Sequence, residues 1–99
     1  MTHIIYSRTE EKHELIVSGH AGFDVTGKDI VCSAISSVCY ALLGYLENYA
    51  SVTSEYYTAS GSLTVTADRS PEVDAVFDMT VIGLQQIQKQ YPRYIGFHV

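Results

Sequence analysis

Four short parts of this 99-residue chain have hydrophobic and polar residues in patterns typical of β-strands. Residues 3–7 and 13–17 are short runs rich in Ile, Val and Tyr, and a charged stretch separates them. Residues 53–58 and 62–67 alternate around Gly61, with Leu and Val on one face and Thr on the other. Each pair of runs therefore predicts a β-hairpin.

Two further segments show the three-to-four-residue spacing of an amphipathic helix. The first covers residues 30–49, in which the apolar positions are Val31, Ile35, Val38, Leu42, Tyr45 and Tyr49. The second begins after Ser70, a frequent N-cap residue type, and places Pro71 in the first helical position. It ends near Gln90, because the residue before Pro92 is disfavoured in a helix.

A hairpin followed by a helix occurs twice, and this order predicts the fold. Both helices can bury their apolar faces by lying on one side of a single sheet. Residues 94–99 would add a short last strand. We therefore expect an α+β fold, a two-layer sandwich with a mainly antiparallel sheet of four to five strands and two helices packed on one face. The element order is β-β-α-β-β-α, and residues 1–99 form one domain.

Composition narrows the class of protein. Hydrophobic residues make up 46% of the chain and charged residues 17%, a balance typical of a globular domain. Six basic against eleven acidic residues, with no basic cluster, argue against direct nucleic-acid binding. The N-terminus lacks an apolar signal segment, so we expect a cytoplasmic chain with reduced cysteines. The uncharged run 30–46 is shorter than the roughly 20 residues that span a bilayer, and we expect a buried helix there, with no membrane partner.

The residues that carry candidate chemistry lie between the first hairpin and the first helix. Residues 18–29 hold three of the seven glycines, show no consistent period and predict an ordered but mobile loop. His20 ends the second predicted strand, and Cys32 begins the helix. If Asp29 caps that helix, Cys32 lies in the first turn, where unpaired backbone N–H groups and the helix dipole favour a thiolate. The loop glycines let the His20 imidazole approach the sulfur.

The pattern alone leaves alternatives open for these residues. Free cysteine is among the most buried residue types, so Cys32 also fits an inert core position, and His20 fits a plain surface or hydrogen-bonding residue. Cys39 shares a helical face with Cys32 at about 10 Å, too far for a disulfide, and is expected in the core. A zinc site would combine these three residues with His13 or His98. It has no short ligand pair, so we expect no metal.

The loop and the start of the helix resemble the signature of the ribosomal-processing cysteine protease (Prp) family. The matching positions are His20, Ala21, Gly22, Asp24, Gly27, Lys28, Asp29, Ile30, Val31, Cys32, Ser33, Ala34, Ile35 and Ser36. The resemblance implies a peptidase without a cofactor that removes a short N-terminal extension from large-subunit ribosomal protein twenty-seven. The family's histidine falls on His20 and its cysteine on Cys32. Asp29 falls on its third motif residue, either to orient the histidine or only to cap the helix.

This resemblance implies thiol-peptidase chemistry, in which His20 accepts the proton of Cys32 and the thiolate attacks the scissile carbonyl. We expect the oxyanion near the backbone N–H groups of Cys32 and Ser33. Phe23 either closes over an apolar substrate or anchors the loop. The residues expected to bind substrate or shape the loop are Gly19, Gly22, Phe23, Gly27 and Ser33.

Helix 30–49 also predicts an oligomer. It is apolar on more sides than one sheet can cover, and we expect that Leu42, Tyr45 and Leu46 cannot all face inward. A homodimer follows, which the resemblance also implies. The competing interpretation is a non-catalytic ribosome-associated or protein-binding module whose thiol and imidazole are structural. A peptidase with another substrate also stays open.

Overall fold

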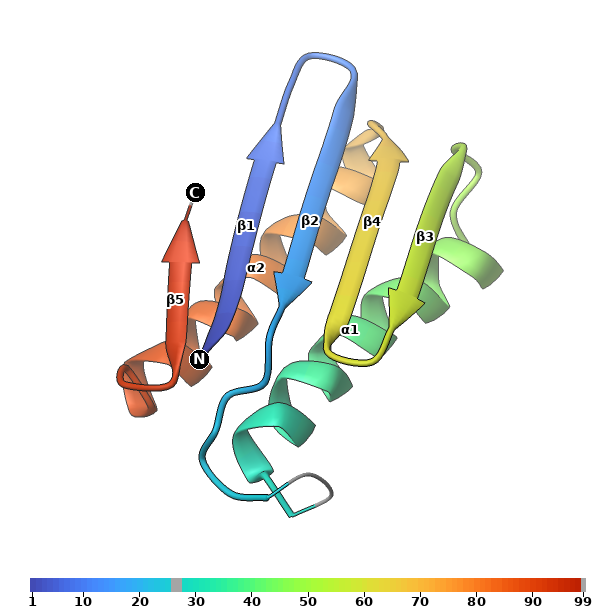
Figure 1. Ribbon diagram of the computed structural model, residues 1–99. Coiled ribbons are helices and arrows are strands. Elements are labelled where there is room, and N and C mark those ends of the chain that lie inside the picture. Colours follow the sequence, from blue (N-terminus) through green and yellow to red (C-terminus); the bar gives the residue numbers. More distant parts are fainter. Residues whose placement is uncertain (26–27, 99) are drawn as a thin grey trace.

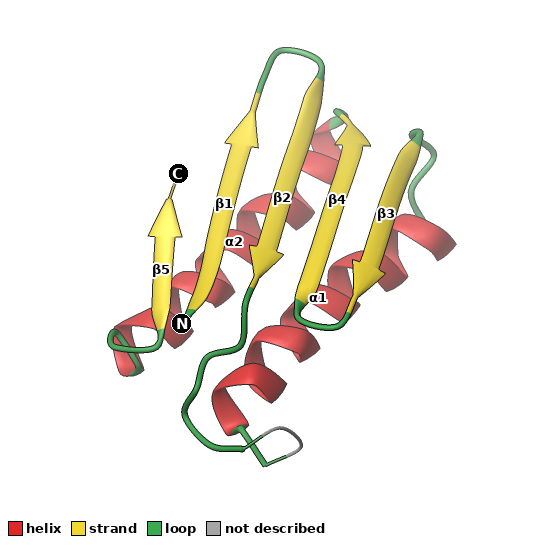
Figure 2. Cartoon of the chain, viewed as in Figure 1, coloured by secondary structure: helices red, strands yellow, loops and turns green. Residues whose placement is uncertain are grey.

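The computed structural model describes residues 1–25 and 28–98, which form two layers (Figure 1). One layer is a five-stranded sheet and the other is a pair of helices that both lie on the same face of it (Figure 2). The elements in chain order are β1 (Thr2–Arg8), β2 (Lys12–Ser18), α1 (Ile30–Asn48), β3 (Ser54–Ala59), β4 (Ser62–Asp68), α2 (Pro71–Gln90) and β5 (Ile95–His98). The predicted α+β two-layer sandwich is confirmed, and the last strand is formed.

The strands follow the order β3-β4-β2-β1-β5 across the sheet. Every neighbouring pair is antiparallel except β1 and β5, which are parallel, so the sheet is mixed. In the pairing of β2 with β4, Ser18 lies opposite Ser62. This register brings the end of β2, from which the loop departs, beside the turn between β3 and β4 (Ser60 and Gly61).

Alternate residues of the three central strands form the core. Ile4, Leu15 and Val65 are fully buried, and they meet Val31 of α1 and Phe77 of α2 in the same cluster. Burial of an aliphatic or aromatic side chain of this size contributes about 1.5–3 kcal/mol. The period of two in the strands and of three to four in the helices thus converges on one core.

The structure corrects one expectation about α1. Leu42 is 1% exposed, Leu46 is 5% exposed and Tyr45 is half-buried. The two leucines find cover within one chain because α2 packs alongside α1, whereas Tyr45 keeps part of its surface exposed. By length and composition alone α1 could cross a membrane, and about a third of it is buried in the fold. The buried Leu42 and Leu46 therefore do not support a homodimer, which stays a prediction.

A polar cluster occupies the end of the sheet opposite the loop. His13, at the start of β2, is fully buried and stacks on Phe77 with ring centroids 4.2 Å apart. Its Nδ1 is hydrogen-bonded to the Tyr6 hydroxyl at 2.7 Å and its Nε2 to Asp74 at 2.6 Å. Arg69 also donates to Asp74, at 2.8 Å. His13 is thus held in the core, away from His20, Cys32 and Cys39, the residues with which it would have formed the zinc site considered from the sequence.

Candidate active site

The start of α1 is organised around Asp29, which is 4% exposed. Its Oδ1 accepts hydrogen bonds from the backbone N–H groups of Val31 (2.9 Å) and Cys32 (3.0 Å), as a helix N-cap does. Its Oδ2 accepts from the N–H groups of Phe23 (2.9 Å) and Asp24 (3.4 Å). One carboxylate therefore ties the loop to the first turn of the helix.

This environment favours the ionised carboxylate. Burial raises the pKa of Asp29, but the N–H donors of Cys32, Asp24 and Phe23 outweigh burial and place the pKa below its ordinary value. Among the described residues, no hydrogen bond joins Asp29 to His20. Of the two roles expected for Asp29, the geometry shows the cap, and any effect on the histidine runs through the loop.

Cys32 lies in the first turn of α1, as expected, and its side chain is partly exposed. The backbone N–H of Ala21 donates to Cys32 Sγ at 3.3 Å. Because Ala21 directly follows His20 and is buried at 3% exposure, the loop is held close to the sulfur. A backbone donor aimed at a sulfur stabilises the charged thiolate more than the thiol.

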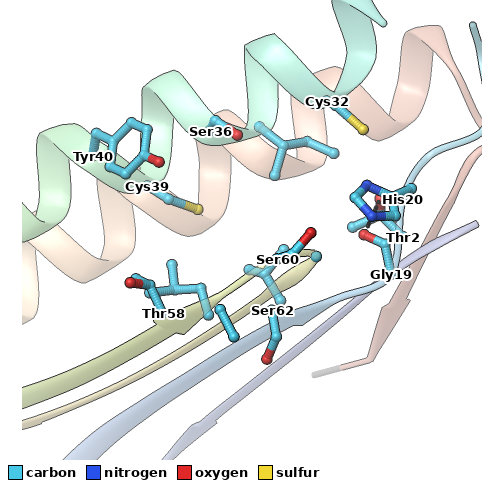
Figure 3. A pocket seen from close by; sticks show the side chains of 15 residues that line it. Thr2, Gly19, His20, Cys32, Ser36, Cys39, Tyr40, Thr58, Ser60 and Ser62 are labelled. Atoms are coloured by element: carbon cyan, nitrogen blue, oxygen red, sulfur yellow. Dashed lines mark hydrogen bonds between the residues drawn. The ribbon is translucent and has the colours of Figure 1, made fainter. Parts of the chain in front are cut away.

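The sequence predicted His20 at the end of the second strand. In the structure it lies two residues beyond the end of β2 and belongs to the loop. Its exposed imidazole lines the same cleft as Cys32, and the Cys32 sulfur points toward it (Figure 3). Within residues 1–25 and 28–98, no hydrogen bond connects the imidazole to the sulfur. In enzymes generally, hydrogen bonds between catalytic groups are often long without substrate and tighten when substrate binds.

Gly19 holds the backbone before this histidine. Its φ of +86° is in the region that favours glycine, and an added Cβ would lie 2.6 Å from the Met1 carbonyl oxygen. Its N–H donates to the carbonyl of Gly61 at 2.8 Å, and its own carbonyl accepts from Thr2 Oγ1 at 3.3 Å. Gly19 thus contributes through its backbone, by fixing where His20 leaves the sheet.

The cleft has a volume of about 360 Å³ and lies between α1 and the β3–β4 hairpin. Figure 3 shows Ser36 and Tyr40 of α1 on one side and Thr58, Ser60 and Ser62 of the hairpin on the other. Its apolar lining comes from Val17, Ile35, Cys39 and Leu63. Sequence reasoning missed the hairpin wall. The available signals were the row of hydroxyl residues around Gly61 and the helical spacing of Cys32, Ser36, Cys39 and Tyr40.

Cys39 is a core residue, as expected. It is 3% exposed, and burial raises the pKa of its thiol to about 11. Both cysteines are free thiols. Cys32 is therefore the thiol that combines access with a position at a helix N-terminus.

The expected oxyanion donors are already in use. The N–H of Cys32 donates to the Asp29 side chain, and the N–H of Ser33 donates to the Asp29 carbonyl at 3.0 Å. Asp29 takes up both of these first-turn donors, and their expected role at the oxyanion stays a prediction. The N–H that does face the sulfur is that of Ala21.

The remaining loop residues have structural positions. Phe23 packs edge-on against Tyr91 and Tyr94, with ring centroids 5.5 and 5.3 Å apart. Phe23 therefore anchors the loop to the end of α2, which is one of its two expected roles. Gly22 has a φ of +77°, and an added Cβ would meet open space. Gly27 lies outside the described residues.

Comparison with known proteins settles the family. The sequence pattern of the family described as "Cysteine protease Prp" matches residues 1–96. The chain belongs to the Prp family of cysteine proteases. A Prp relative from Mycoplasma genitalium, a ribosomal processing cysteine protease, is 31% identical over 81 residues, or 82% of each chain. Another Prp of that name, from Mycoplasma pneumoniae, is 27% identical over 89 residues, covering 90% of this chain and 89% of the relative.

Solved structures confirm the Prp fold. The ribosomal processing protease Prp from S. aureus, in complex with a covalently linked product peptide, superposes with a TM-score of 0.90 at 21% identity. The match covers 99% of this chain and 98% of that one. A protein from Streptococcus mutans superposes with a TM-score of 0.75 at 22% identity, over 99% and 92% of the two chains. As a Prp family member the chain is a cysteine protease, and the expectation of an enzyme is confirmed.

Proposed function

We propose that this protease removes the N-terminal extension of large-subunit ribosomal protein twenty-seven during ribosome assembly, with Cys32 as nucleophile and His20 as general base and acid. One observation carries the proposal. Of the two free thiols, Cys32 alone is partly exposed, and it shares a cleft with His20. Two mycoplasma relatives named as ribosomal processing proteases support the ribosomal substrate.

The proposed reaction follows the order of groups around the sulfur. His20 accepts the thiol proton of Cys32, and the sulfur attacks the scissile carbonyl carbon. The N–H of Ala21 donates to the sulfur at 3.3 Å and so favours the attacking thiolate. His20 then protonates the leaving amine, an acyl-enzyme remains on Cys32, and water hydrolyses it.

The cleft also suits an extended peptide with an apolar residue at the cleavage site. Ile35 and Leu63 offer apolar contacts near Cys32, and the hydroxyl groups of Ser36 and Ser60 can hydrogen-bond a peptide backbone. Among the described residues that line the cleft there is no Asp, Glu, Lys or Arg. The net charge of -5 favours encounter with a basic protein substrate.

The deciding experiment is incubation of the purified chain with the extended ribosomal protein. Mass spectrometry of the products should show loss of the N-terminal segment at one bond. Cys32→Ala should give no product, whereas Cys39→Ala, which removes the buried thiol, should still cleave. An intact substrate with wild-type enzyme, or cleavage by Cys32→Ala, would contradict the proposal.

We also propose a homodimer in the cytoplasm as the working form. Several large apolar side chains are exposed on the surface of a single chain, among them Met79 (68% exposed) and Tyr49 (80% exposed). Sedimentation at micromolar concentration should give about twice the mass of one 11.0 kDa chain. A mass of one chain throughout the concentration range would remove the dimer from this proposal.

A further inference from the structure

We infer that Gly61, in the β3–β4 turn, is a positioning residue for the catalytic histidine. This inference rests on the proposed function of His20 and adds a residue that lies 41 positions further along the chain. The sequence alone identifies Gly61 only as the centre of a predicted hairpin. In the structure the His20 imidazole lies beside the place where a side chain of residue 61 would begin.

The close approach is between position 61 and the Nε2 end of the His20 ring. A Cβ on Gly61 would lie 3.0 Å from His20 Nε2 and 3.4 Å from both Cδ2 and Cε1. A carbon this close is tighter than ordinary packing, so any side chain at position 61 pushes against the ring. The absence of a side chain on Gly61 thus allows the imidazole to occupy its present place in the cleft.

The same turn also holds the backbone of the loop. The carbonyl of Gly61 accepts from the N–H of Gly19 at 2.8 Å, one residue before His20. The pairing of Ser18 with Ser62 leads directly into this bond. Gly61 therefore restrains the main chain before the histidine and leaves room for the end of its side chain.

Gly61 can meet these two demands because of its backbone conformation. Its φ is +71°, which an L residue adopts at a cost. The neighbouring residues Thr58, Ser60 and Ser62 line the substrate cleft. One hairpin therefore forms a wall of the cleft and sets the place of the base, so a shift of the turn changes the distance from the imidazole to Cys32.

Two substitutions separate the ring contact from backbone strain. Gly61→Ala adds the Cβ and strains the turn, whereas Gly61→Asn adds the same Cβ in a residue that tolerates positive φ. Gly44→Ala is the matched control, because a Cβ at this α1 position meets nothing within 4 Å and Gly44 lies outside the cleft. For each variant we would measure kcat and KM on the extended substrate, thermal stability, and the NMR resonances of the His20 ring.

We expect both Gly61 variants to lower kcat by up to about tenfold, because the ring must give by a few tenths of an ångström and misplacement of a catalytic group by about 1 Å costs on the order of 100-fold. KM should change less than about twofold, and the His20 resonances should move while those of His13 stay in place. Gly44→Ala should leave kcat, KM and the His20 resonances unchanged, and it should raise thermal stability slightly because Ala favours a helix more than Gly does. A purely structural role of the turn would lower stability without moving the His20 ring.

Two results would overturn the inference: wild-type kcat in both folded Gly61 variants, or a loss in Gly61→Ala that Gly61→Asn restores, which would assign the effect to backbone strain. If the wild-type enzyme itself does not cleave, the proposed function fails instead. The inference about Gly61 is then judged by the His20 resonances and by the rate at which iodoacetamide modifies Cys32.

Discussion

The backbone N–H of Ala21 donates a hydrogen bond to Cys32 Sγ at 3.3 Å, across eleven residues of sequence. This bond places the residue after the histidine directly at the thiol. It also means that the loop and the first turn of α1 approach each other at the sulfur, and not only at the Asp29 carboxylate. Reactivity at Cys32 should therefore depend on the loop as well as on the helix.

The two thiols should differ in their reaction with an alkylating reagent. Near neutral pH, iodoacetamide should modify Cys32 and leave Cys39 unmodified, because Cys39 is buried and its thiol has a pKa of about 11. Peptide mass spectrometry at short reaction times measures the ratio. Equal labelling of both cysteines in folded protein would contradict this expectation.

Replacement of each thiol by a hydroxyl should separate chemistry from packing. Cys32→Ser should fold and bind the extended substrate yet lose at least about 100-fold in turnover, since a hydroxyl is a far weaker nucleophile than a thiolate without a full serine-peptidase triad. Steady-state cleavage and thermal unfolding measure the two effects. Cleavage near the wild-type rate would show that Cys32 is not the nucleophile.

The matched variant Cys39→Ser should behave in the opposite way. Turnover should persist, and the free energy of unfolding should fall by about 1–3 kcal/mol, because a hydroxyl enters an apolar site. The cost stays at the lower end if the new hydroxyl donates to the carbonyl of Ile35, one helical turn earlier. Urea unfolding measures this difference, and full stability with lost turnover would reverse the assignment of the two cysteines.

Substitution of Asp29 should separate its two sets of hydrogen bonds. Asp29→Asn keeps one oxygen to cap Val31 and Cys32 but replaces the oxygen that accepts from Phe23 and Asp24 with an NH2 group. We expect a loss of about 1–3 kcal/mol of stability, because two loop N–H groups lose their acceptor, together with faster hydrogen exchange in the loop and lower turnover. Asp29→Ala should in addition lose about 0.5–2 kcal/mol of stability as the cap disappears. If Asp29→Asn retains full turnover, the loop contacts of this carboxylate are not needed for catalysis.

The polar cluster around His13 should make stability fall in acid. Burial lowers the pKa of His13, so the unfolded chain takes up the proton first and stability declines as the pH drops below about 6.5. The hydrogen bond from the Arg69 guanidinium holds the pKa of Asp74 well below its ordinary value. Burial raises this pKa, but the hydrogen bond from His13 lowers it further. A carboxyl of this kind adds stability above about pH 4, and this contribution is lost as the pH falls further.

Asp74→Asn tests this acid dependence. The variant should be less stable at pH 7, and its stability should decline less steeply than that of the wild type below about pH 4. Asp78→Asn is the control, since Asp78 pairs with Arg8 in a more exposed position, and it should change the curve little. Urea unfolding from pH 7 to pH 3 gives both curves. Parallel curves for wild type and Asp74→Asn would contradict the assignment.

Much of the fold and part of the site could be read from local sequence patterns. The start of α1 follows from Asp29 and an apolar period, and the start of α2 from Ser70 and Pro71. Both depend on residues within a few positions of each other, where backbone geometry and capping chemistry act directly. The sequence by itself therefore determined the order of the elements and the placement of Cys32 in the first helical turn.

Only the tertiary structure decided what lies opposite that turn. The pairing of β2 with β4 brings Gly61 to His20, and the packing of α2 against α1 covers Leu42 and Leu46. Strand order, register and helix-on-helix cover depend on contacts between segments tens of residues apart, which a single period along the chain does not encode. For the same reason the hairpin wall of the cleft became visible only in three dimensions.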